Sequence, residues 1–296
     1  MSVQVSVQRG DARGIALAVL CGCAYGIAPP LARLTYDAGA DVWTVSTARF
    51  VAGVLAIGAL VWLGRGLRRL PARANWGALG LGLISTVTSL GYMGAIYFIP
   101  ASLAVLIFYT FPLLVAVGAR WTEGEPLTPI KLAGLSVAFV GLAVALGVTF
   151  DDLDRRGVAL AALAAVGAAA HVLAVSRVAR WTGGATLPLN LRSMSVALGF
   201  NLLLLAWNGG PTWPAGEVGW VALGGTMAFF TVGVTSMYAA IARLGPVRAS
   251  ILLNLEPLVA ILAAIVLLGE RFGPHQILGA ALVLGAVLWV QLKRRG

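Results

Sequence analysis

The chain has 296 residues, of which 59% are hydrophobic and only 11% are charged, and its mean hydropathy is +0.91. Soluble domains carry about 25% charged residues, so this composition excludes an ordinary water-soluble enzyme or binding module. The net charge of +10 does not indicate nucleic-acid binding, because the basic residues flank long apolar segments, as they do beside anionic lipid.

Ten apolar segments follow one another along the chain, separated by short connections. Each is close to the ~20 residues that a helix needs to cross the hydrocarbon core of a bilayer. None shows the alternating pattern of a membrane β-strand. The sequence therefore predicts an all-α membrane protein with ten transmembrane helices. The predicted spans are residues 14–36, 42–64, 75–97, 101–119, 130–149, 157–179, 185–207, 217–240, 247–267 and 273–292.

The basic residues of the connections predict the orientation of these spans. If the N-terminus is cytoplasmic, the outer connections hold only Arg33, Arg155, Arg156 and Arg271. Cytoplasmic loops are enriched in Lys and Arg, so we predict that the N-terminus and the C-terminus both lie inside. All nine tryptophans fall near predicted span ends, where aromatic belts form. The basic residues of the inner segments are Arg9, Arg13, Arg65, Arg68, Arg69, Arg73, Arg120, Lys131, Arg177, Arg180, Arg243, Arg248, Lys293, Arg294 and Arg295.

The two halves of the sequence repeat each other. Residues near the start of the halves align at an offset of 143, and later residues align at 145. Because each half holds five predicted spans, the second copy must cross the membrane in the opposite sense. The aligned pairs include Arg13 and Arg156, Gly14 and Gly157, Arg49 and Arg192, Pro112 and Pro257, Gly124 and Gly269, Glu125 and Glu270, Pro129 and Pro274, and Gly134 and Gly279.

This repetition predicts the domain organisation. We expect a single transmembrane domain, residues 1–296, made of two inverted five-helix repeats at about 9–150 and 151–296. Inverted repeats are a recurring architecture of secondary transporters, whose substrate sites lie near the bilayer midplane between the repeats.

A motif in the second half points to a family. The segment Leu255-Glu256-Pro257-Leu258-Val259, followed by Leu267-Leu268-Gly269-Glu270-Arg271 and a glycine-rich last helix, resembles the signature of EamA-type members of the drug/metabolite transporter superfamily. The first half carries a weaker copy, Phe111-Pro112-Leu113-Leu114 followed by Glu123-Gly124-Glu125. The resemblance implies a ten-helix exporter of amino acids, related metabolites or amphipathic drugs, with a central cavity and no covalent chemistry.

Prolines and glycines predict where helices bend, end and begin. Pro112 and Pro257 fall inside predicted spans, as does the pair Pro29-Pro30. A proline inside a helix removes a backbone hydrogen bond, so we predict kinks there, which serve either packing or gating. Glycine commonly ends a helix and proline begins one. Such ends and starts are predicted at Gly124-Glu125 with Pro129 and at Gly269-Glu270 with Pro274.

Three charged residues, Arg49, Arg192 and Glu256, fall well inside predicted spans. Charge in a membrane is costly, so such groups usually face the bundle interior or water. For the two arginines, structural pairing with carbonyls or with Glu256 competes with substrate contact. Glu256 aligns with Phe111, so the repeat does not explain it. It could offset an arginine, hold an ammonium group or carry a proton.

Polar residues that differ between the repeats complete the predicted site. His171 could be an interhelical hydrogen-bonder or a pH-sensitive site residue. Tyrosines offer an apolar ring together with a hydroxyl, although each could equally serve packing. We expect a central cavity lined by the first to fourth and sixth to ninth helices, with the small-residue helices at 130–149 and 273–292 outside it. The predicted substrate-binding residues are Tyr25, Arg49, Tyr92, Tyr109, His171, Tyr238, Asn254 and Glu256.

Several functions lack their sequence motifs. The chain has no GxxxxGK[ST], no HExxH and no GxSxG, so ATP hydrolysis and the usual zinc and serine hydrolases are not expected. Cys21 and Cys23 point to different faces of one helix, which disfavours a disulfide or a metal site. We therefore expect no enzyme activity, no cofactor and no metal. The expected partners are a small-molecule substrate and membrane lipid, but not nucleic acid.

The leading hypothesis is a secondary transporter in the cell membrane, or the inner membrane if the chain is bacterial. It would export small organic metabolites by alternating access, with amino acids, including aromatic or apolar ones, or related amphipathic compounds as the expected substrates. One alternative is a drug or organic-cation exporter of the same fold. Another is an intramembrane enzyme using His171 and Glu256. A channel is disfavoured because it would need rings of like groups. A phosphate exchanger is disfavoured because it would need more than two mid-span arginines.

Overall fold

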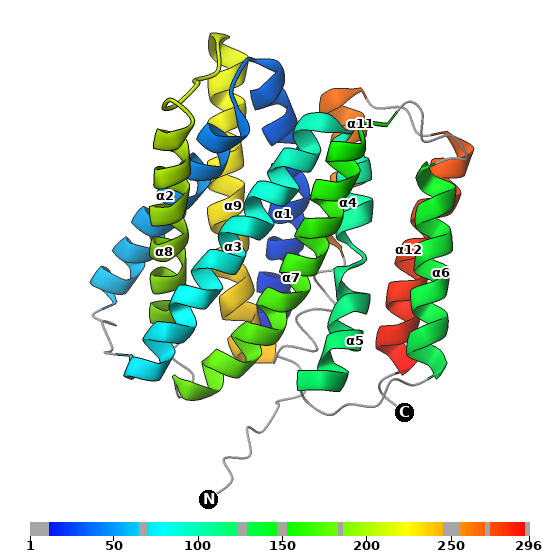
Figure 1. Ribbon diagram of the computed structural model, residues 1–296, viewed down its shortest axis with the longest axis horizontal. Coiled ribbons are helices and arrows are strands. Elements are labelled where there is room, and N and C mark those ends of the chain that lie inside the picture. Colours follow the sequence, from blue (N-terminus) through cyan, green and yellow to red (C-terminus); the bar gives the residue numbers. More distant parts are fainter. Residues whose placement is uncertain are drawn as a thin grey trace, which may run out of the picture.

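The computed structural model describes residues 12–64, 70–122, 129–146, 153–182, 186–244, 255–269 and 273–293. Within these residues all regular secondary structure is α-helical, and the helices form one upright bundle (Figure 1). Six of the described helices are long and apolar enough to cross a membrane by length and composition. Three shorter apolar helical stretches, Leu103–Val115, Leu132–Ala145 and Pro274–Ala286, lie beside them.

The helices of the first half start and end close to the predicted spans. The start of the second helix is fixed by a cap, since Asp41 accepts a hydrogen bond from the backbone amide of Thr44 at 2.7 Å. The first helix stays α-helical through Pro29 and Pro30. The helices of this half are α1 (Ala12–Asp37), α2 (Val42–Leu63), α3 (Ala72–Phe98), α4 (Ala101–Phe108), α5 (Phe111–Thr122) and α6 (Pro129–Leu146).

The prediction of one continuous helix over 101–119 is wrong. The chain turns at Tyr109 and Thr110, which divide this span into α4 and α5. Pro112 is the second residue of α5, where a missing amide hydrogen costs little because first-turn amides have no acceptor within the helix. The expected proline kink is therefore a break that lies just before the proline.

The second half repeats this arrangement. The predicted span 247–267 begins outside the described residues, and its described part starts at Glu256 with Pro257 as the second helical residue. This start matches the start of α5 at an offset of 145, so the proline again follows a helix start and does not kink a helix. The helices of this half are α7 (Arg155–Trp181), α8 (Thr186–Trp207), α9 (Gly216–Leu244), α11 (Glu256–Leu268) and α12 (Pro274–Lys293).

Most of the predicted helix ends and starts between the last two helices of each half are observed. Pro129 begins α6 and Pro274 begins α12. Gly269 ends α11 in the left-handed conformation, with φ of 65°, and its amide reaches back to the carbonyls of Ala264 and Ile265. The predictions for Gly124, Glu125 and Glu270 lie outside the described residues.

The main helix pairs of the bundle have counterparts: replacing each helix by its equivalent in the other half gives another observed pair. The extensive contact between α1 and α9 has its counterpart between α3 and α7, and the contact between α3 and α8 has its counterpart between α2 and α9. Two further pairs, α2 with α8 and α6 with α12, join equivalent helices of the two halves. This pattern is that of two repeats related by an approximate two-fold axis.

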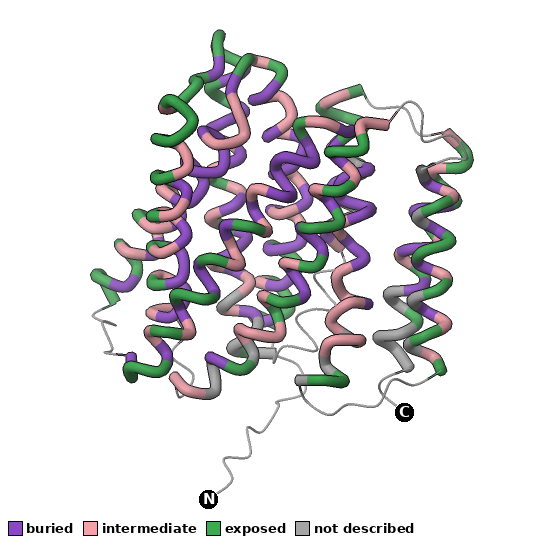
Figure 2. Tube along the Cα trace, in the orientation of Figure 1, coloured by how far each residue is buried: buried purple, intermediate pink, exposed green. Residues whose placement is uncertain are grey.

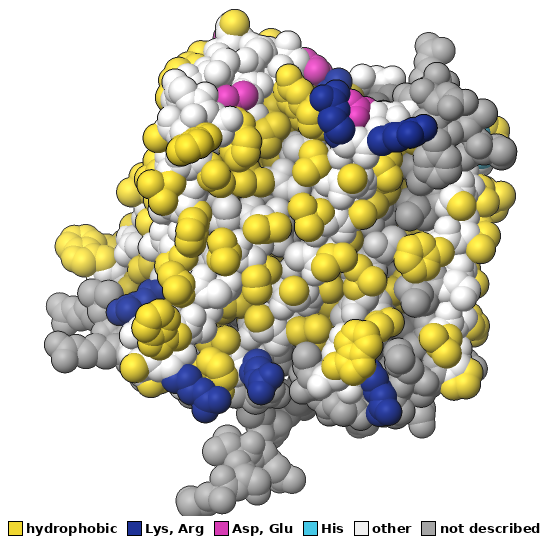
Figure 3. Space-filling model, viewed as in Figure 1, with side chains coloured by type: hydrophobic (Ala, Val, Ile, Leu, Met, Phe, Trp, Pro, Cys, Tyr) yellow, Lys and Arg dark blue, Asp and Glu magenta, His cyan; other side chains and the backbone are white. Residues whose placement is uncertain are grey.

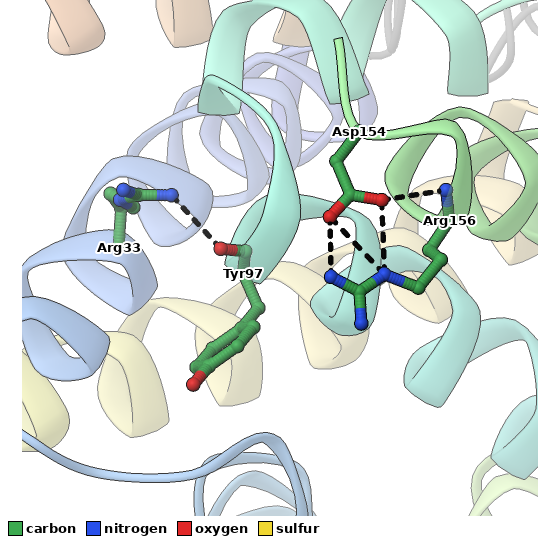
Figure 4. A network of polar contacts seen from close by, with 4 residues as sticks. All are labelled: Arg33, Tyr97, Asp154 and Arg156. Atoms are coloured by element: carbon green, nitrogen blue, oxygen red, sulfur yellow. Dashed lines mark hydrogen bonds and ion pairs between the residues drawn. The ribbon is translucent and has the colours of Figure 1, made fainter.

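The directions of the helices agree with an inverted relationship between the halves. Arg33, near the end of α1, donates to the Tyr97 carbonyl at the end of α3 at 3.1 Å (Figure 4). It also donates to the Ile96 carbonyl at 3.0 Å. Arg156, at the start of α7, stacks over the Phe98 ring at 4.4 Å. The ends of α1 and α3 thus share one face of the bundle with the start of α7. The equivalent helices α1 and α7 therefore run in opposite directions (Figure 1).

The pair formed by α6 and α12 stands at one edge of the bundle (Figure 1). Its backbones approach closely at Gly141 and Gly279. A Cβ built on Gly279 would lie 2.5 Å from the Gly141 carbonyl oxygen, a distance that no side chain tolerates. Small residues in membrane helices permit such contacts, and here they join the last helix of each repeat.

The outer surface of the bundle has the pattern of a membrane protein. Buried residues gather where the central helices meet, and exposed residues face outward (Figure 2). On the face shown in Figure 3, apolar side chains cover the middle, Lys and Arg lie along the lower edge, and Asp and Glu lie near the upper edge together with further Lys or Arg side chains. Exposed tryptophans, as expected of an aromatic belt, include Trp62, Trp76, Trp121, Trp207, Trp213 and Trp220.

Candidate functional site

The break between α4 and α5 meets the start of α11 through a buried hydrogen bond. Tyr109, in the turn between α4 and α5, donates its hydroxyl to Oε2 of Glu256, the first residue of α11, at 3.1 Å. The two residues are only 2% and 8% exposed. The bond joins the break between α4 and α5 in the first repeat to the start of α11 in the second.

This contact lies near the middle of the bundle. A Cβ built on Gly26 would lie 2.7 Å from the backbone carbonyl oxygen of Glu256, so only glycine lets α1 and α11 approach this closely. Gly26 is close to the midpoint of α1, a helix of 26 residues. At 1.5 Å per residue this point is roughly 15 to 20 Å from either helix end, near the midplane of a hydrocarbon core about 30 Å thick.

Arg49 is the second buried charge of this region. It lies on α2, is 6% exposed, and its guanidinium carbon is 4.0 Å from the centre of the Phe230 ring on α9. The ring attracts the cation through its quadrupole. The Nε and Nη1 atoms of Arg49 are buried and have no hydrogen-bond partner among the described residues. The predicted pairing with carbonyls or with Glu256 is therefore absent at these two atoms, although Glu256 is within electrostatic range.

Tyr92 belongs to the same region. It lies on α3, is 9% exposed, and its ring centre is 4.5 Å from that of Phe108 on α4. Electrostatic interactions connect it with Arg49 and with Glu256. Its hydroxyl is buried without a hydrogen-bond partner in the described part of the chain. We call Arg49, Tyr92, Tyr109 and Glu256 the central cluster.

Four of the eight predicted site residues thus lie together, and Tyr25 lies beside them. The Tyr25 ring centre is 6.2 Å from that of Phe230, and Tyr25 is within electrostatic range of Arg49. Tyr238 is part of α9, but its side chain is outside what the structure describes. Asn254 lies outside the described residues. For these two residues the assignment to the site stays a prediction.

His171 is connected elsewhere. Its Nε2 shares a 3.2 Å hydrogen bond with the Ser85 hydroxyl, which joins α7 to α3. No contact described for His171 involves a member of the central cluster. The geometry matches the interhelical hydrogen bond that the sequence left open as one of two interpretations.

Arg192, the repeat partner of Arg49, is also placed differently from the prediction. It is exposed on α8, and its Nη1 donates to Oδ1 of Asn75, near the start of α3, at 2.7 Å. The acceptor is thus the carbonyl oxygen of a side-chain amide, and not the Glu256 carboxylate that the sequence also suggested. Its duplication in the repeat does not make it a second buried charge.

Two site neighbours were missed by sequence reasoning. Phe230 gives no signal, because it is one apolar residue in an apolar span and only packing places it under Arg49. Tyr36, near the end of α1, has the position of a residue at the membrane interface, yet it is 7% exposed and its hydroxyl has no partner among the described residues. It is within electrostatic range of Arg49.

A buried polar network also escaped prediction. The Ser46 hydroxyl on α2 donates to Oδ1 of Asn201 on α8 at 2.8 Å and shares a 3.0 Å hydrogen bond with Ser89 on α3. The Asn201 amide nitrogen donates to the Ala197 carbonyl at 2.8 Å. The polar groups of this network are paired within the protein, so the network holds α2, α3 and α8 together and does not need a ligand.

The arrangement can bind, but it lacks the parts of a metal site. In the ranges that the structure describes, no three His, Cys, Asp or Glu side chains gather closely enough to hold a metal ion. The central cluster instead offers a guanidinium, a carboxylate and aromatic rings from several helices. Such groups bind a small molecule with both charged and apolar parts.

The apolar helices and the charged groups buried among them define a multi-pass membrane protein. The family described as EamA-like transporter matches residues 12–147 and again residues 155–292, which are the two halves of the bundle. The chain belongs to this family, which is part of the drug/metabolite transporter superfamily.

Comparison with solved structures agrees at the level of the fold. A crystal structure described only as that of a protein shares 23% sequence identity and a TM-score of 0.66, over 95% of this chain and 98% of the other. No curated protein sequence matches the chain.

Proposed function

We propose that the protein is a secondary transporter that exports small organic metabolites, with aromatic and apolar amino acids as the first candidates. The observation that supports this function is the burial of Arg49 from the first repeat and Glu256 from the second near the middle of the bundle. Membrane proteins keep such costly groups mainly where they meet substrate or water. Opposite charges suit the two ends of a zwitterion, and Tyr25, Tyr92 and Phe230 suit its side chain.

In this proposal all ten predicted spans cross the membrane and both termini are cytoplasmic. The supporting argument is the excess of Lys and Arg in the connections assigned to the inside. The location is the cell membrane, or the inner membrane if the chain is bacterial. The partners are the substrate and the surrounding lipid.

The mechanism is alternating access of the central cluster to the two sides of the membrane. The turn at Tyr109 and the helix start at Glu256 are interruptions about which short segments can move. The hydrogen bond between these two residues joins the repeats. It would be remade each time the repeats change their relative position, and substrate binding to Glu256 would compete with it.

Two alternatives have less support. A drug or organic-cation exporter would use Glu256 and the aromatic rings, but the buried guanidinium of Arg49 repels a cation. An intramembrane enzyme using His171 and Glu256 is disfavoured, because the described partner of His171 is Ser85 on α3.

Counterflow in liposomes tests the proposal. The purified protein is reconstituted with unlabelled substrate inside, and labelled substrate is supplied outside. We expect transient accumulation of a labelled aromatic amino acid that saturates with concentration. The matched control is Glu256→Gln, which keeps the size of the side chain and removes its charge, and which should slow the exchange.

Two results would contradict a carrier for these substrates. One is the absence of accumulation for every amino acid and organic cation tested, with protein that still unfolds cooperatively. The other is a flux that rises linearly with concentration without saturation, which would indicate a channel.

A further inference from the structure

Three buried hydrogen-bond donors near the central cluster lack partners. They are the guanidinium of Arg49 at Nε and Nη1, the hydroxyl of Tyr36 and the hydroxyl of Tyr92, none of which has a partner within the described residues. The three residues are 6%, 7% and 9% exposed, respectively. They come from α2, α1 and α3, and electrostatic interactions connect Arg49 with both tyrosines. We call these residues the donor triad.

Unpartnered donors of this kind are uncommon. A polar group buried without a hydrogen bond costs about 1 to 3 kcal/mol, and a charged group costs more. The face of the Arg49 guanidinium lies against Phe230, but its N–H donors point in the plane of the group and remain unused by this contact. The donors of the triad therefore lack acceptors, whereas the Tyr109 hydroxyl of the central cluster has one in Glu256.

The carboxylate already in the cluster does not supply those acceptors. Glu256 accepts the hydroxyl of Tyr109 at Oε2 and forms no hydrogen bond with Nε or Nη1 of Arg49. A ligand that satisfies the triad must carry acceptors, and an anionic acceptor makes the strongest hydrogen bonds to a guanidinium. The triad holds one guanidinium and no lysine, so it suits one carboxylate, which would share Arg49 with the nearby Glu256.

The surroundings of the triad are aromatic. Phe230 lies under Arg49, Phe108 lies beside Tyr92, and the Tyr36 ring makes an edge contact with Tyr97 at 5.5 Å between centres. A flat or apolar body next to a carboxylate would contact these rings. We propose that the donor triad binds the carboxylate of an aromatic or apolar monocarboxylate, and that this group, not an ammonium group, is what the transporter selects.

This inference rests on the proposed transport function and narrows its substrate class. It predicts that an aromatic acid without an ammonium group still binds, whereas the corresponding amine does not. The opposite ranking is expected if Glu256 dominates recognition, as in an organic-cation exporter.

Three ligands that share a phenyl ring and a short chain separate these outcomes. They are phenylalanine, 3-phenylpropanoate, which lacks the ammonium group, and 2-phenylethylamine, which lacks the carboxylate. Binding to the full-length protein in lipid nanodiscs is measured by calorimetry at pH 7.4. We expect the first two ligands to bind, and the amine to bind at least about tenfold more weakly, as the loss of a charge-assisted hydrogen bond implies.

Variants of the triad test which of its residues bind the carboxylate of the ligand. Arg49→Gln should remove the preference for acid over amine, whereas Arg49→Lys should weaken binding and keep the preference. Tyr36→Phe and Tyr92→Phe should each weaken the binding of the two carboxylate ligands about three- to tenfold, without changing the binding of the amine. Because these two changes remove a single hydroxyl with no partner, the unliganded protein should remain as stable as before.

Several results would overturn the inference. Tighter binding of the amine than of 3-phenylpropanoate would do so, as would an unchanged preference in Arg49→Gln. Loss of stability in unliganded Tyr36→Phe and Tyr92→Phe would show that these hydroxyls have a structural role. If the amine alone binds and shows counterflow, transport stands and carboxylate selection falls. If none of the three ligands binds to folded protein, carboxylate selection falls as well, and the wider counterflow panel decides the transport function.

Discussion

Arg49 and Arg192 occupy equivalent positions in the two repeats, yet their surroundings differ. Arg49 is buried against the middle of α9, with Phe230 covering its guanidinium and two nitrogen atoms without described partners. Arg192 is exposed and donates to Asn75 near the start of α3. The repeat thus preserves a residue at one place in the backbone, while the neighbouring helix decides whether that residue is a buried charge or a surface contact.

The same contrast holds at the interrupted helices. Tyr109 in the first repeat donates to Glu256 in the second, whereas the residue that matches Glu256 in the first repeat is Phe111. The two repeats therefore supply different chemical groups to one contact. At this contact the hydrogen-bonding groups differ between the repeats, whereas the helix starts before Pro112 and Pro257 agree.

The largest effect is expected from the pair of arginines. Arg49→Gln should lower the counterflow rate about ten- to a hundredfold, because it removes the charged donors of the central cluster. Arg192→Gln should change the rate less than about twofold, because an exposed polar contact contributes little. Equal loss in both variants would mean that the repeat position matters and the surroundings do not.

The buried hydrogen bond comes next. Tyr109→Phe should lower the free energy of unfolding by about 1 to 3 kcal/mol, because it leaves the Glu256 carboxylate without this donor. Tyr97→Phe is the matched control, since Tyr97 is an exposed tyrosine near the end of α3. Chemical unfolding in detergent measures both variants, and a similar small loss in both would remove the special role of the Tyr109 contact.

The close contact between α6 and α12 provides a structural comparison with the central cluster. Gly279→Ala should destabilise the fold by about 1 to 3 kcal/mol, because its new methyl group meets the backbone of α6. Gly285→Ala, on the same helix, places its methyl group in open space and should be nearly neutral. Thermal unfolding in nanodiscs separates the two, and equal stability would mean that the two helices are not held together at Gly279.

His171 should matter less than the central cluster. His171→Ala removes the hydrogen bond to Ser85, and such interhelical bonds contribute about 0.6 kcal/mol on average in membranes. Ser85→Ala should have the same small effect on unfolding, and the double variant should add little. A large loss of counterflow in His171→Ala, with a pH dependence between pH 5.5 and 8, would instead place His171 in the site.

The smallest effect concerns an exposed pair at the start of α7. The hydrogen bonds that Arg156 donates, the shortest at 2.7 Å, hold the pKa of Asp154 below its ordinary value (Figure 4). A depressed pKa stabilises the folded state above the ordinary pKa of about 4. This contribution should be lost as the pH falls below that value, and Asp154→Asn should remove it. Unfolding of both forms between pH 3 and 7 checks this, and identical pH profiles would contradict it.

Much of the fold could be predicted from the apolar segments and the offset between the halves. The starts at Pro129 and Pro274 and the end at Gly269 were predicted correctly, because these residues act through their own backbone. The break before Pro112 was not predicted. A single sequence gives the position of a proline, but a continuous helix and a helix that restarts one residue before the proline have the same apolar pattern.

The site was predicted unevenly for a related reason. Arg49, Tyr92, Tyr109 and Glu256 stood out because polar groups are rare in apolar spans and costly to bury. Phe230 and the polar network of Ser46, Ser89 and Asn201 were missed, since neither an apolar residue nor a small polar one is unusual in such a segment. His171 was ambiguous in the sequence, because its partner Ser85 lies 86 residues away along the chain.

The sequence by itself determined that the chain is helical, lies in a membrane and consists of two related halves, because composition and local backbone preferences decide these properties. Only the tertiary structure decided which of the polar residues meet. Arg49 and Arg192 are equivalent in sequence, and they differ because one packs against the middle of α9 and the other reaches the start of α3. The partners of a buried charge are set by the packing of distant helices, which no local pattern of residues encodes.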